Sequence, residues 1–256
     1  MHRQALGIFA RSLLCVLLVL VMCGLSRAGG QRKTLTSKAR AKPAVKPETP
    51  HLAFVTEYIR ELSAYEELRA KGEQENAEAQ GSTDSTAIFT SMIHSSTLFQ
   101  LELRTDVARL KDMRLNPPFD FLIPSITDFY AQKIKLWQRM SDIGTAFIGG
   151  PQPGVDYSQL TAEMPKLRAN LDYIDQALFE AAPAIFGTLI DPKADSQGHA
   201  SHLIITKAER QNLIEKLDTD FGSKLDQKNQ NYTVSAASVL KTYLLKDFKT
   251  SDEPWR

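Results

Sequence analysis

Apolar residues between Leu160 and Ile185 recur at alternating steps of four and three, the most regular pattern in this chain of 256 residues. Its members are Leu160, Met164, Leu167, Leu171, Ile174, Leu178, Ala181 and Ile185. This spacing is typical of a helix that packs nearly parallel to its neighbours. Pro165 and Pro183 predict kinks in that helix, because proline lacks a backbone donor and crowds the carbonyl four residues back.

Five further stretches have helical spacing or helix-terminal signals, and no stretch alternates as a strand does over more than a few residues. We expect these helices near residues 50–80, 84–115, 125–148, 206–225 and 235–248. The start signals are Thr49 before Pro50, Ser125 with Asp128, and Thr206 with Glu209. The polar second half of the first helix is expected to be a solvent-exposed overhang. The sequence therefore predicts an all-α fold, a single bundle-like domain of about six helices.

The apolar run from Leu13 to Leu25 follows the basic residues Arg3 and Arg11 and precedes small residues before Gly29. This order is typical of a secretory signal peptide, which we predict over residues 1–28. The run is shorter than the ~20 apolar residues that a membrane span needs. The expected location is extracytoplasmic, either periplasmic or secreted. An uncleaved anchor over residues 5–25 is the alternative.

Residues 29–50 hold basic residues, Pro, Ala and Thr with few large apolar groups, which predicts a disordered basic linker before a helical domain at 51–256. The first 50 residues contain nine of the 31 Lys and Arg but one of the 30 acids, so the remainder is acidic. An anionic surface is a possible contact for this linker. Nucleic acid is the least favoured partner, because the domain itself is acidic.

Catalytic motifs are missing from the sequence. It has no GxSxG, no GxxxxGK, no GxGxxG after a strand and no HExxH. Both cysteines, Cys15 and Cys23, lie in the predicted signal peptide, so the mature chain would have neither disulfides nor a thiol nucleophile. We therefore predict a protein without a cofactor, and a non-enzymatic role is favoured. Catalysis without a recognisable motif stays open.

Two groups of residues are candidate sites. The first is an aromatic stripe that could line an apolar pocket, although such stripes are more often core; its residues are Phe129, Tyr130, Trp137 and Phe147. The second is a polar loop whose imidazoles and carboxylates could bind a divalent metal; its residues are Asp191, Asp195, His199 and His202. A solvated surface loop is the plainer interpretation of the second group.

The favoured function is that of an exported, non-enzymatic helical protein that acts through contacts with an unknown protein or envelope component. A helical bundle that binds an apolar small molecule or lipid near Trp137 is the first alternative. A metal-binding protein that uses the 191–202 loop is the second.

Overall fold

We describe the protein from a computed structural model, which defines residues 49–80, 85–117, 119–189, 203–226 and 231–254. The predicted signal peptide, nearly all of the predicted linker and the 191–202 loop lie outside these residues. The described part is all-helical, as predicted. Its α-helices are α2 (Pro50–Gln80), α3 (Ser85–Asp112), α4 (Leu122–Ile148), α5 (Tyr157–Gly187), α6 (Lys207–Phe221) and α7 (Tyr232–Leu244), with a 3-10 helix η2 (Gly222–Asp226) after α6.

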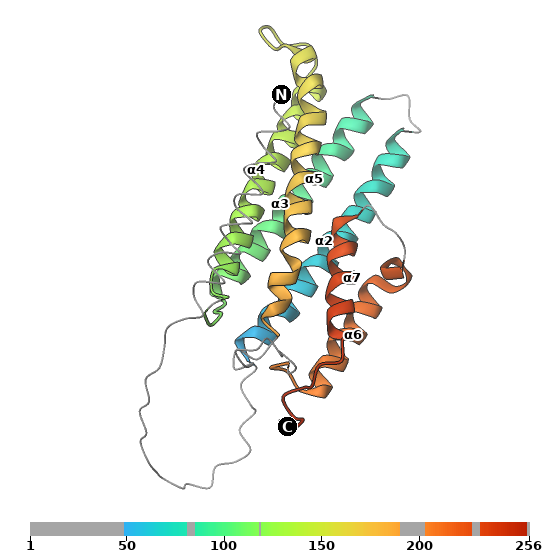
Figure 1. Ribbon diagram of the computed structural model, residues 1–256. Coiled ribbons are helices and arrows are strands. Elements are labelled where there is room, and N and C mark those ends of the chain that lie inside the picture. The colour runs from blue at the N-terminus through green and yellow to red at the C-terminus, as the bar shows by residue number, and fades with distance from the viewer. Residues whose placement is uncertain (1–48, 81–84, 118, 190–202, 227–230, 255–256) are drawn as a thin grey trace, which may run out of the picture. The chain divides into compact units, whose positions relative to one another are not determined.

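Five of these helices form a closed ring in contact order. Helix α2 packs against α3, α3 against α4, and α4 against α5; α5 then packs against α7, and α7 against α2 (Figure 1). Helix α6 lies against α7, η2 and α2. Helix α7 has 13 residues, whereas α2 and α5 have 31 each. At about 1.5 Å per residue, α7 can close the ring along less than half of its length.

The main core lies inside the part of the ring that α7 closes. Phe54, Val55 and Ile59 of α2 are fully buried there, together with Phe186 of α5 and Leu240 of α7. Most of the buried apolar residues of α2, α6 and α7 belong to this core. In α5 the stripe is confirmed from Leu167 to Ile185, except that Ala182 is buried in place of Ala181. Helix α5 continues past both Pro165 and Pro183.

Two of the three helix starts predicted from the sequence are present in the structure, and one differs. Helix α2 begins at Pro50, and Thr206 forms the full capping box with Glu209 at the start of α6. The predicted cap at Ser125 is wrong, because α4 already begins at Leu122. Leu122 and Ile126 are both buried on one face, and Pro124 is tolerated in a first turn whose N–H groups have no intrahelical acceptor.

The second half of α2 is not the free overhang that its polar sequence suggests. Gly72 is buried, and a methyl group placed on it would lie 3.5 Å from Ser95 of α3. Nearby, the Ser91 hydroxyl donates to Asn76 (3.1 Å) and His94 lies 3.0 Å from Glu75. Small and polar residues therefore bring α2 and α3 together here, without the apolar stripe on which the prediction relied.

Candidate functional site

An ion-pair network lies between α2 and α3, with Arg60 at its centre. The Arg60 guanidinium donates to Glu57 (2.8 Å), Glu102 (3.2 Å) and Asp106 (2.5 Å). Arg109 approaches Glu57 at 3.6 Å. Asp106 is 2% exposed, and this burial raises its pKa to about 6 although Arg60 acts in the opposite direction. Each partner of Arg60 is an acid, so the network carries more negative than positive charge.

Glu61, one turn after Glu57 on α2, is the most deeply buried acid of this region, with 1% exposure. Its Oε2 accepts a hydrogen bond from the Tyr130 hydroxyl at 2.9 Å. Its Oε1 has no hydrogen-bond partner among the described residues. Burial, reinforced by the nearby charge of Asp106, raises the pKa of Glu61 well above its ordinary value. An unpaired oxygen on a buried carboxyl can accept a hydrogen bond or bind a metal ion.

A small cavity of about 30 Å³ opens beside Glu61. Its polar lining includes Tyr58, Glu61, Asp106, Tyr130, Lys133 and Asp175. The Tyr58 hydroxyl is fully buried and, like Glu61 Oε1, finds no hydrogen-bond partner in the described structure. A cavity needs about 10–15 Å³ to hold one water molecule. This one therefore has room for an ion or a few waters, and it is too small for an organic substrate or an acyl chain.

Lys133 of α4 closes one side of the cavity. It is 2% exposed and pairs with Asp175 of α5 at 2.5 Å, while its ammonium lies 3.7 Å from the centre of the Tyr65 ring. Burial by itself would lower the pKa of Lys133, but Tyr65 and Asp175 outweigh it and raise the pKa. The lysine is therefore a fixed positive charge, balanced locally by Asp175.

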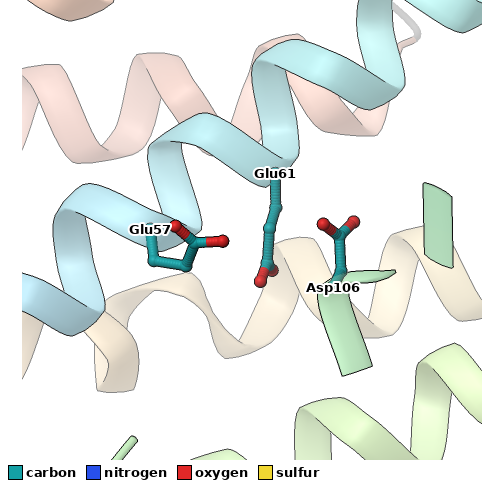
Figure 2. A group of neighbouring side chains, drawn as sticks. All are labelled: Glu57, Glu61 and Asp106. Carbon is teal, nitrogen blue, oxygen red and sulfur yellow. The ribbon is translucent and has the colours of Figure 1, made fainter. Parts of the chain in front are cut away.

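Three carboxylates from two helices lie close together, and two of them, Glu61 and Asp106, line the cavity. One oxygen from each of Glu57, Glu61 and Asp106 lies within 4.8 Å of the other two. Figure 2 shows Glu57 and Glu61 on successive turns of α2, with Asp106 reaching from α3 beside Glu61. Carboxylate oxygens are the ligands that hard divalent cations prefer.

A second feature, which we call the apolar end, lies beyond the reach of α7, where the start of α3, the end of α4 and the start of α5 meet. Phe89 stacks on Phe147 with ring centres 4.4 Å apart, and Phe147 contacts Tyr157 at 5.3 Å. Ile88 and Ile148 remain 37% and 40% exposed. The apolar end consists of Ile88, Phe89, Met92, Ile93, Phe147, Ile148, Tyr157, Leu160 and Met164, all of them exposed or half-buried.

The predicted aromatic stripe of α4 is divided between these regions. Tyr130 lines the polar cavity, whereas Phe129 packs half-buried against the main core. Trp137 stacks on Phe99 at 4.5 Å, and Phe147 belongs to the apolar end. The four side chains therefore do not surround one cavity, and their role as an apolar-ligand site stays a prediction. The four predicted metal ligands, Asp191, Asp195, His199 and His202, lie outside the described residues.

Sequence reasoning did not select the acids around Arg60, although a signal was present. Glu61 and Asp106 lie within the apolar stripes of their helices, Glu61 between Tyr58 and Leu62 and Asp106 between Leu103 and Leu110. An acid on a face that is otherwise buried indicates a paired or functional group.

Comparison of the chain with protein-family models, with curated proteins and with solved structures gave no significant match. Function must therefore be inferred from the chain's own residues. Among the described helices, none has the length and apolar character needed to cross a membrane.

Proposed function

We propose that the helical domain is a non-enzymatic binding domain that acts through contact with a protein partner, and that the apolar end is its contact surface. The observation that supports this proposal most directly is the incomplete burial of Ile88, Ile148 and their neighbours at the end that α7 does not reach. Contiguous exposed apolar residues on a soluble domain commonly mark sites of protein contact.

The composition of the apolar end also favours a protein partner. Aromatic residues and methionine are enriched in protein interfaces, and both occur here, as Phe89, Phe147, Met92 and Met164. Methionine adapts its shape to a partner because its side chain is unbranched and flexible. The polar cavity, at about 30 Å³, is too small for an organic ligand and takes no part in the proposed contact.

The proposal includes export of the domain, for which the apolar run Leu13 to Leu25 is the support. The mass of the mature protein, purified from its native cells, tests this part. A chain that begins at Gly29 is expected. A chain that retains residues 13–25 would replace export with membrane anchoring.

Site-specific crosslinking tests the contact surface. A photo-crosslinking amino acid would replace Ile88 or Ile148 in the full-length chain, expressed in its native cells. Leu101 of α3 and Tyr173 of α5, which are 64% and 38% exposed but lie outside the apolar end, are the matched control positions. We expect one discrete protein adduct from Ile88 and Ile148 and only background from the controls. Equal labelling at all four positions would refute the proposed surface.

A charge variant connects the adduct to the apolar surface itself. Ile88→Lys should remove the adduct formed from position 148 without changing the thermal melting temperature, because an exposed side chain contributes little to the core. Light scattering of the purified chain shows whether the partner is a second copy of the chain, which would give a dimer that Ile88→Lys dissociates. An adduct that survives Ile88→Lys would contradict the proposal.

A further inference from the structure

The carboxylates of Glu57, Glu61 and Asp106 lie close together. Glu61 and Asp106 also line a cavity with two buried oxygen atoms that have no hydrogen-bond partner in the described structure, Glu61 Oε1 and the Tyr58 hydroxyl. Leaving a buried polar atom unpaired costs about 1–3 kcal/mol. Two such atoms at one cavity indicate that something polar fills it. The Tyr58 hydroxyl points to this occupant independently of the acids, because tyrosine carries no charge to be balanced.

We propose that the space between these three carboxylates, next to the cavity, binds one hard divalent cation, such as Ca²⁺ or Mn²⁺, held by Glu57, Glu61 and Asp106 with the Tyr58 hydroxyl as a neighbouring oxygen. The proposal is independent of the contact surface at the apolar end.

The spacing of the oxygens suits such an ion. Three atoms that all lie within 4.8 Å of one another have a common point about 2.8 Å or less from each. The Ca²⁺–oxygen distance is about 2.3–2.6 Å, so small side-chain movements complete the coordination. Every available ligand atom is oxygen, which favours Ca²⁺, Mg²⁺ or Mn²⁺ over Zn²⁺. The cavity of about 30 Å³ has room for the ion and a bound water.

The charge balance also favours a doubly charged ion. Three acids, Glu57, Glu102 and Asp106, form ion pairs with Arg60 or Arg109, and Glu61 lies beside them as a fourth acid. With the four acids ionised, the cluster has an excess of two negative charges, because Lys133 is paired separately with Asp175. A divalent ion would cancel this excess. Arg60 shares Glu57 and Asp106 with the proposed ion, so Glu61, which Arg60 does not contact in the described structure, is the ligand on which binding should depend most.

Calorimetry and thermal melting of the full-length chain, stripped with a chelator and titrated with Ca²⁺ or Mn²⁺, test the proposal. We expect one ion per chain and a rise in melting temperature. Glu61→Gln should weaken binding at least tenfold, while its amide oxygen still accepts the Tyr130 hydrogen bond. Glu67→Gln, an exposed position on the same helix that loses the same charge, is the matched control and should bind as the wild type does.

Tyr58→Phe separates ion binding from folding. No described hydrogen bond is lost in this variant and an unpaired buried hydroxyl is removed, so its melting temperature without metal should equal or exceed that of the wild type, while its affinity for the ion should fall. Absence of binding at millimolar Ca²⁺, Mg²⁺ and Mn²⁺ would overturn the proposal and assign the cavity to water. Equal affinities of the wild type, Glu61→Gln and Glu67→Gln would overturn it as well, because they would show that the ion binds at another place in the chain.

Discussion

Replacement of Asp106 by Asn should stabilise the metal-free protein at neutral pH, although it removes one charge from an ion pair. The folded structure raises the pKa of Asp106 from 3.8 to about 6, with burial as the largest cause. The folded state therefore holds this proton more tightly than the unfolded state does. The associated stability is fully present below pH ~3.8 and is lost as the pH rises through about 6.

The size of the effect follows from the two pKa values. A difference of about 2 corresponds to about 3 kcal/mol, because each pKa unit is worth about 1.4 kcal/mol. Asparagine has the shape of the protonated carboxyl, and its amide oxygen can still accept the hydrogen bond from Arg60. We therefore expect Asp106→Asn to match the wild type near pH 4 and to exceed its unfolding free energy by up to about 3 kcal/mol at pH 7.

Urea unfolding with chelator present, at several pH values from 4 to 7.5, measures this difference. Subtracting the wild-type value at each pH removes the contribution of acids that do not interact with Asp106. The pKa of Glu61 is raised in part by the charge of Asp106, so the loss of that charge stabilises the variant in the same direction. Asp172→Asn, an exposed position on α5, is the control and should show little difference at any pH. A variant less stable than the wild type at pH 7, or a difference that does not change with pH, would refute the reasoning by showing that the Arg60 pair outweighs burial.

Three further substitutions test the fold. Lys133→Met leaves Asp175 without its partner and should lower the urea-derived unfolding free energy by about 2–3 kcal/mol. Lys135→Met, at an exposed position on α4, is the control and should have little effect. Equal losses in the two variants would contradict the stabilising role of the Lys133–Asp175 pair. Thr206→Ala removes the capping box of α6 and should cost about 1 kcal/mol in the same assay, with Thr219→Ala inside that helix as a neutral control. Gly144→Val should lower the melting temperature, at a cost of about 1–3 kcal/mol, because a Cβ at this position would lie 2.8 Å from Ile93 and 2.9 Å from Met92. Thr145→Val, at an exposed position, is the control and should be tolerated. An unchanged melting temperature for Gly144→Val would show that α3 can move aside.

The helical fold was predictable because local rules act strongly along this sequence. The four-and-three spacing from Leu167 to Ile185 and the capping box at Thr206 need only neighbouring residues, and both are present in the structure. The pairing of α2 with α3 beyond Gly72 was not predictable in this way. It depends on small and polar residues that meet across two helices, and such contacts leave no periodic signal.

The candidate sites were harder still to predict, because they depend on contacts between residues far apart in the sequence. Tyr130 was selected from its aromatic stripe, but its contact with Glu61 joins residues 69 positions apart in the sequence. The cavity takes further groups from α3, α5 and α7, and only the folded ring brings them together. The short length of α7, which leaves the apolar end uncovered, is visible in the sequence, but its position in the ring is not.

Because α7 closes the ring, the helical domain can finish folding only after α7 has been synthesised. Helix α7, the last of the described α-helices, packs against α2, the first of them. Asn231 at the start of α7 hydrogen-bonds Glu66, 165 residues earlier. A nascent chain that lacks residues 231–244 has no partner for the α7-facing sides of α2 and α5. These apolar sides would stay exposed until α7 has been synthesised. Translation products that stop before α7 should therefore be bound by chaperones or degraded. Substitutions at the apolar end, which α7 does not cover, should be tolerated far better.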